Sequence, residues 1–114
     1  MSIHIPVSRS LIENSDFTIV DIRTEPEWKQ TGIIQGSHLI TFFDVQGNYD
    51  AKAFLKQMDE LAKDDKEIAL ICRTGNRTGQ VANFMVQQGY NVKNLDGGVV
   101  SLANEGFKFE PYQG

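Results

Sequence analysis

The chain alternates between two hydrophobic patterns. Four short apolar runs have the length and composition of buried strands: residues 17–22, 37–42, 67–72 and 92–95. Two longer segments instead place apolar residues at helical spacing, one over residues 51–62 and one that ends at Gln88, just before Gly89. Because helical segments separate the strands and no hairpin turn joins two of them, we expect the strands to pair in parallel.

Shorter elements complete this pattern. Thr24 and Glu27 have the spacing of a capping box, so a short helix is predicted to begin after Thr24. Residues 8–13 predict another short helix, and residues 3–5 predict a short edge strand. The predicted fold is α/β, with a mostly parallel sheet of about five strands and helices on both faces, formed by residues 1–114 as one domain.

The composition is that of an ordinary globular domain. The 114 residues are 40% hydrophobic and 23% charged. No apolar run approaches the ~20 residues of a membrane span, and the first residues lack the basic start and apolar centre of a signal peptide. We therefore expect a cytoplasmic protein with no membrane partner. The net charge of −4 also argues against nucleic acid as a partner.

Charge is distributed unevenly along the chain. Residues 68–95 include no acidic residue but three cations, Arg73, Arg77 and Lys93. The same stretch holds Cys72, the single cysteine, which excludes an internal disulfide and an internal second thiol for a redox cycle. We expect this local positive field to attract small anions toward Cys72.

Cys72 follows the apolar run 68–71 and precedes the predicted helix, which places it at a strand-to-helix turn. At such a turn, backbone N–H groups and the helix N-terminus favour a thiolate or a bound anion. A lone cysteine is more often a small buried residue, but the polar run after it cannot belong to an apolar core. The predicted substrate-binding residues are Arg73, Thr74, Gly75, Asn76, Arg77 and Thr78.

Other kinds of site fit this sequence less well. The loop lacks the Gly-Lys-Ser/Thr ending of a nucleotide-binding loop, and Asp96-Gly97-Gly98 lacks the spacing of a dinucleotide fingerprint. One cysteine and two isolated histidines, His4 and His38, make no cluster of metal ligands. No metal and no cofactor is predicted.

Several segments together resemble the motifs of the rhodanese family of sulfurtransferases. Residues 21–28, Asp-Ile-Arg-Thr-Glu-Pro-Glu-Trp, are similar to its Asp-x-Arg-x-x-x-Glu-aromatic signature, residues 32–37 to its Gly-His-Ile-Pro-Gly-Ala segment, and residues 95–98 to its C-terminal motif. The Cys72 loop matches the active loop, and the likeness extends over about residues 3–107. Their order and spacing make the combined signal specific, although Ile33 and Gln35 replace the family's His and Pro.

This resemblance implies a thiosulfate sulfurtransferase. The Cys72 thiolate would attack the outer sulfur of a small anionic donor, thiosulfate or a persulfide, and would carry that sulfur as a persulfide until cyanide or a thiol removes it. The backbone N–H groups of residues 73–78 would surround the persulfide, while Arg73 and Arg77 would attract the donor. Protein partners that supply or receive the sulfur stay open.

The resemblance also involves residues outside the loop. Asp21, Arg23 and Glu27 would form a polar network, and its role is either structural or supporting at the site. Phe42 or Phe43 is predicted to wall the entrance to Cys72.

The length of the loop separates two chemistries on this fold. Four residues lie between Cys72 and Arg77, as in the sulfurtransferases, whereas the related phosphatases and arsenate reductases have five. A tetrahedral phosphate needs a wider ring of donors than one sulfur atom, so a phosphatase is a minor alternative. A protein-to-protein persulfide relay and a non-catalytic binding module stay open as well, although a complete loop with an exposed thiol argues against the binding module.

Overall fold

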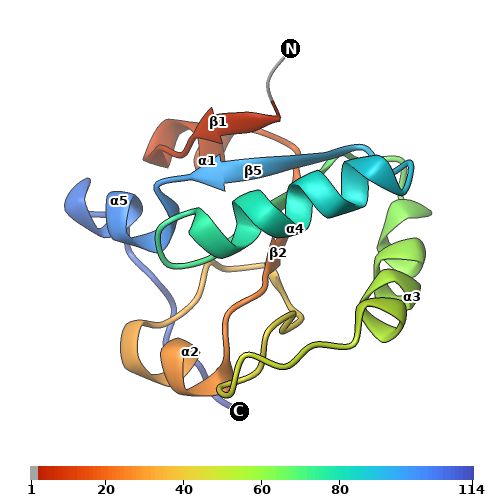
Figure 1. Ribbon diagram of the computed structural model, residues 1–114. Coiled ribbons are helices and arrows are strands. Elements are labelled where there is room, and N and C mark those ends of the chain that lie inside the picture. The colour runs from red at the N-terminus through yellow and green to blue at the C-terminus, as the bar shows by residue number, and fades with distance from the viewer. Residues whose placement is uncertain (1–2) are drawn as a thin grey trace.

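The computed structural model describes residues 3–114, and it confirms the α/β class. Within these residues five strands form a sheet in the order β1-β5-β4-β2-β3, and each pairing in this sheet is parallel. The strands are β1 (His4–Pro6), β2 (Thr18–Asp21), β3 (His38–Leu39), β4 (Ile68–Ile71) and β5 (Val92–Asp96). The helices are α1 (Arg9–Asn14), α2 (Glu25–Thr31), α3 (Ala51–Ala62), α4 (Asn76–Gln87) and α5 (Gly98–Asn104), as Figure 1 shows.

Helices cover both faces of the sheet, as predicted. On one face, α3 and α4 pack against the sheet through buried residues that include Met58, Val81 and Met85. On the other face, α1 and α5 pack through Leu11 and Leu102, among others. The two hydrophobic clusters lie on opposite sides of β4, because successive side chains of a strand point to opposite faces.

Strand β4 forms the centre of this arrangement. It pairs with β2 on one side and β5 on the other, and all four of its residues are buried. Leu70 and Cys72 belong to the cluster under α3 and α4, whereas Ala69 and Ile71 belong to the other. A strand that is buried on both faces is a continuous apolar run in the sequence, which explains why residues 67–72 could be predicted to form a strand.

Local sequence signals place several helix ends. The Ser8 hydroxyl accepts a hydrogen bond from the Leu11 N–H at the start of α1, and the Asp50 carboxylate accepts one from the Ala53 N–H at the start of α3. At the start of α2, the Glu27 carboxylate accepts from the backbone N–H of Thr24, so the predicted capping box is confirmed.

Two expectations differ from the structure. The run 37–42 forms a strand only at His38–Leu39, although the N–H groups of Ile40 and Phe42 still donate to carbonyl oxygens at and just after the end of β2. The chain then turns inward to bury the Phe42 ring. Helix α5 was not predicted, because it begins with glycine and gains its stability from tertiary packing rather than from helix propensity.

In the part of the chain that the structure describes, no helix is both long and apolar enough to cross a membrane.

Candidate active site

Cys72 occupies the first position after β4, at the carboxyl end of the central strand. The chain turns through residues 73–75 and enters α4 at Asn76. In open parallel sheets, ligands bind beyond the carboxyl ends of the strands, and the loop of Cys72 lies at that edge. The predicted loop residues 73–78 therefore lie at this edge, on the turn and in the first turn of α4.

The sulfur of Cys72 is held by its own loop. The Gly75 N–H donates to Sγ at 3.2 Å, and the Thr78 hydroxyl lies 3.4 Å from Sγ. Burial raises the pKa of the thiol, but hydrogen bonds from the Thr78 hydroxyl and from the N–H groups of Thr78, Gly75 and Thr74 lower it more. The net result is a Cys72 pKa below its ordinary value, which increases the thiolate fraction near neutral pH.

The expectation of an exposed thiol was wrong. Cys72 is only 1% exposed and belongs to the core cluster that also includes Phe42 and Val81. The loop folds around the side chain rather than presenting it, because Gly75 and Thr78 close over the sulfur from the start of α4.

Gly75 permits this tight turn. Its φ of 102° lies in the left-handed region, and a Cβ built there would approach the Asp96 Oδ1 to 2.8 Å. Gly75 also caps α4, whose twelve residues direct the positive end of the helix dipole toward the loop. Gly75 thus provides the left-handed turn of the loop and also marks the positive end of α4, which favours an anion.

The outer side of the loop is bound by the segment that starts α5. The N–H groups of Gly97, Val99 and Val100 donate to the carbonyl oxygens of Thr74, Cys72 and Arg73, respectively, at 3.0, 3.0 and 3.1 Å. These bonds require close contact between the two backbones. A Cβ on Gly98 would lie 2.4 Å from the carbonyl oxygens of both Cys72 and Arg73, so only glycine fits there.

Arg77 is paired with Glu27 of α2. Its Nη1 and Nη2 donate to the two carboxylate oxygens at 2.8 and 2.7 Å, which is a bidentate ion pair. The hydrogen bond from Arg77 is the main reason that the pKa of Glu27 falls from 4.5 to about 2. In this structure its guanidinium joins the loop to α2, and its predicted role as a cation for the donor stays a prediction.

A second, fully buried ion pair lies at the end of β2. The guanidinium of Arg23 donates to both oxygens of Asp21, and its other N–H groups donate to Thr31 Oγ1 and to the Gly32 carbonyl. Both side chains are 1% exposed. Asp21 and Arg23 thus fix the far end of α2, and Glu27 on the same helix holds Arg77. Of the three residues, Arg23 contacts α2 and Glu27 belongs to it, and their predicted role at the site stays a prediction.

The positive field around Cys72 is smaller than the sequence indicated. Residues distant in sequence supply acids to two of the three cations, since Arg77 pairs with Glu27 and Lys93 lies 4.0 Å from Glu67. Arg73 makes no ion pair within residues 3–114, and its side chain is exposed. It lines a cavity of about 350 Å³ between α2 and α5.

The structure adds Asn94, which sequence reasoning missed. Its side chain on β5 is 2% exposed and accepts a hydrogen bond from the Thr78 hydroxyl. The amide nitrogen lies 2.9 Å from Nδ1 of His4. A polar residue inside the apolar run 92–95 was the available signal, because buried polar side chains need partners.

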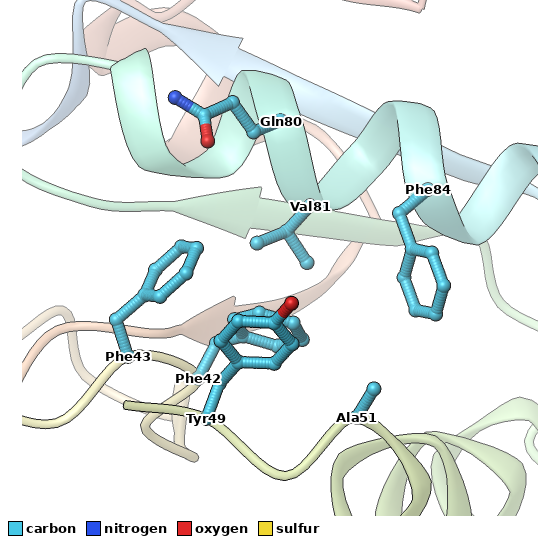
Figure 2. Close-up of a pocket in the computed structure, with 7 residues that line it drawn as sticks. All are labelled: Phe42, Phe43, Tyr49, Ala51, Gln80, Val81 and Phe84. Atoms are coloured by element: carbon cyan, nitrogen blue, oxygen red, sulfur yellow. The ribbon is translucent and has the colours of Figure 1, made fainter. Parts of the chain in front are cut away.

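An aromatic pocket of about 280 Å³ opens beside the first turns of α4. Figure 2 shows the rings of Phe42, Phe43 and Tyr49 gathered opposite Val81 and Phe84. Phe42 is buried and stacks with the ring of Tyr49, with centroids 5.2 Å apart. Cys72 does not line this pocket, so the prediction that Phe42 or Phe43 walls its entrance stays a prediction.

Within residues 3–114, no group of three or more His, Cys, Asp or Glu side chains is arranged to hold a metal ion.

Comparison with known proteins assigns the family. Residues 7–105 match the rhodanese-like domain, and the chain belongs to this family. It is 33% identical over 106 residues to a protein of Allochromatium vinosum named sulfurtransferase, a match that covers 88% of this chain and 84% of that protein. An uncharacterized protein of Rickettsia prowazekii is 37% identical over 92 residues, which is 77% of this chain and 73% of that protein.

A crystal structure shows the same fold. The rhodanese-related protein of Thermoplasma volcanium superposes with a TM-score of 0.67 and 28% sequence identity, covering 90% of this chain and 94% of that one. The chain is thus a rhodanese-like domain that is homologous to proteins named sulfurtransferases, as the sequence motifs indicated.

The close contact at Gly98 gives a first prediction. Gly98→Ala should lower the free energy of unfolding by about 3 kcal/mol or more, since the new Cβ forces α5 away from the loop in addition to straining a positive φ. Gly106→Ala is the matched control, because Gly106 also has a positive φ but has no atom within 4 Å of its would-be Cβ. It should cost only about 1 kcal/mol in urea unfolding. Equal losses of unfolding free energy in the two variants would show that the close contact at Gly98 does not contribute to stability.

The pair of Glu27 with Arg77 gives a second prediction, for stability against pH. Because folding lowers the Glu27 pKa to about 2, the stabilisation is present above the unfolded pKa and is lost as the pH falls toward 2. Glu27→Gln should reduce the free energy of unfolding by about 1–2 kcal/mol at pH 6, allowing for solvent screening, and by roughly half as much near pH 3.

Urea titrations at the two pH values measure this difference. Glu60→Gln is the control, since Glu60 pairs with Lys63 on the surface and its side chain is 70% exposed. A Glu27→Gln deficit of the same size at both pH values would contradict an ionic origin.

Proposed function

We propose that this protein is a sulfurtransferase that moves sulfane sulfur from thiosulfate or a persulfide to cyanide or a thiol. The observation that carries the proposal is the Gly75 N–H that donates to the sulfur of Cys72, with the Thr78 hydroxyl beside it, in a loop that holds the Cys72 pKa below its ordinary value. Such a set of donors stabilises negative charge wherever it develops at this point.

Two displacements make up the reaction. The Cys72 thiolate attacks the outer sulfur of thiosulfate, a new S–S bond forms, and the old S–S bond breaks with its electron pair leaving on sulfite. The acceptor thiolate or cyanide then attacks the outer sulfur of the persulfide, and the electron pair of that S–S bond returns to Cys72. No external oxidant or reductant is needed, because the sulfur changes partners in both steps.

The hydrogen-bond donors around Sγ contribute more by stabilising the negative charge that develops during sulfur transfer than by ionising the thiol. Lowering a thiol pKa from ~8.5 by ~2 units raises the thiolate fraction at pH 7 by roughly 25-fold. Nucleophilicity falls with pKa at a slope of about 0.4–0.5, which leaves a gain of only about threefold. We therefore assign the N–H groups of Thr74, Gly75 and Thr78 mainly to the persulfide and the transition states around it.

The dimensions of the loop support sulfur rather than phosphate as the transferred group. Only four residues separate Cys72 from Arg77, so the loop offers a narrow ring of N–H donors. A phosphoryl group would need donors around three more oxygens.

Cys72→Ser tests the covalent step. The intact mass of wild-type protein should rise by one sulfur atom after incubation with thiosulfate and return after cyanide is added, with thiocyanate released. The folded serine variant should gain no mass and transfer no sulfur, because a hydroxyl oxygen cannot form the persulfide. A mass gain in the serine variant would overturn the assignment. A gain from a small persulfide but not from thiosulfate would identify the relay.

The exposed cation gives a further prediction. Arg73→Ala should raise the KM for thiosulfate by about threefold to tenfold at low ionic strength, and the effect should shrink as salt screens the attraction. Lys56→Ala, which removes one charge from the exposed side of α3, should leave KM unchanged. A KM effect that does not change with salt would show that Arg73 acts on the loop structure instead.

A further inference from the structure

The Thr78 hydroxyl has one proton and several acceptors around it. It is fully buried, and it lies 3.4 Å from the sulfur of Cys72 and 3.3 Å from the Gly75 carbonyl oxygen. Its shortest hydrogen bond is to Oδ1 of Asn94 on β5. When the proton is directed at Asn94, the hydroxyl can only accept from sulfur, which suits a neutral thiol.

The orientation of the Asn94 amide is held from its other side. Its Nδ2 lies 2.9 Å from Nδ1 of His4 on β1 and 3.4 Å from the Gly75 carbonyl oxygen. With Nδ2 turned toward the Gly75 carbonyl oxygen and the His4 ring nitrogen, Oδ1 faces Thr78. The amide therefore draws the hydroxyl proton away from Cys72.

Ionisation of Cys72 changes the role of the Thr78 hydroxyl from acceptor to donor. A thiolate has no proton to donate, so its hydrogen bond to Thr78 needs the hydroxyl proton. Oγ1 of Thr78 and Oδ1 of Asn94 would then face each other as two acceptors without a proton between them. Rotating the amide by half a turn exchanges oxygen for nitrogen at nearly constant volume, and Nδ2 can then donate to Oγ1.

We infer that Asn94 is a positioning residue whose amide decides whether the Thr78 hydroxyl proton is directed at Asn94 or at the sulfur of Cys72. It acts through Thr78 and touches no reacting atom. Only the link between this proton and catalysis rests on the proposed function, because there the thiolate is the attacking species. The proton equilibrium itself is a property of the folded chain.

The titration of Cys72 measures this effect directly. The rate of alkylation by iodoacetamide as a function of pH reports on this thiol alone, because the chain has one cysteine. Asn94→Leu removes the competing oxygen and should lower the Cys72 pKa by about 0.5–1 unit. Asn94→Asp, which has the same shape but only accepts, should raise it by about 1 unit or more. Asn94→Ala replaces the leucine variant if leucine prevents folding.

A variant of Thr78 shows whether Asn94 acts through the Thr78 hydroxyl or through a general effect on the structure. Thr78→Val keeps the shape of the side chain, removes the hydroxyl and should raise the Cys72 pKa. If Asn94 acts through Thr78, adding Asn94→Leu to Thr78→Val should cause no further shift. All these variants leave the side chains of the charged and titratable groups around the loop in place: Asp21, Arg23, Glu27, Arg73, Arg77, Asp96 and His4.

Asn83→Asp is the control for added charge, because Asn83 is an exposed residue of α4. It should leave the Cys72 pKa within about 0.2 unit of the wild type. The inference is overturned if Asn94→Leu does not lower the pKa, or if its shift persists in Thr78→Val. These readings need no sulfur transfer, so a chain that fails to transfer sulfur but shows the predicted shifts contradicts the proposed function alone.

Discussion

The site depends on one constraint of the backbone: a loop that turns its N–H groups toward one atom turns carbonyl oxygens away from it, and buried carbonyls need donors. In this protein the donors come from Gly97, Val99 and Val100, which bind the outer side of the loop. Because β5 lies beside β4 in the sheet, the segment after β5 arrives next to the segment after β4. The order of the strands thus brings donors to the carbonyl oxygens on the outer side of the loop, and this allows the N–H groups of the loop to face the sulfur.

The same constraint explains why glycine is needed at two facing positions. Gly75 provides the left-handed turn on the loop side, where any side chain would meet Asp96. Gly98 provides the close approach on the α5 side, where a Cβ would meet two carbonyl oxygens. Two backbones that exchange hydrogen bonds leave no room for side chains between them. The inner donors are therefore held in place by the backbone itself, which is the condition for electrostatic stabilisation of negative charge at this point.

Sequence reasoning found the parts of the site that are contiguous in the chain. The buried strand β4, the start of α4 and the capping box of α2 all follow from local patterns, and they locate Cys72 at a strand-to-helix turn. What it missed arises from contacts between distant segments. The charge of Arg77 is met by Glu27, fifty residues earlier, and the hydroxyl of Thr78 is met by Asn94. Helix α5 also depends on packing that its glycines do not indicate.

Burial of Cys72 follows from the same arrangement and changes what the loop has to do. An apolar setting by itself disfavours a thiolate, so a sulfur that is 1% exposed would be inert without its donors. The N–H groups and the Thr78 hydroxyl reverse that preference, while the apolar neighbours keep water from competing for the donors. Because Thr78 has one proton to share, its hydrogen bond to Asn94 is one of the contacts that set the balance between neutral and ionised sulfur. A site built this way can hold negative charge strongly and still be adjusted from β5.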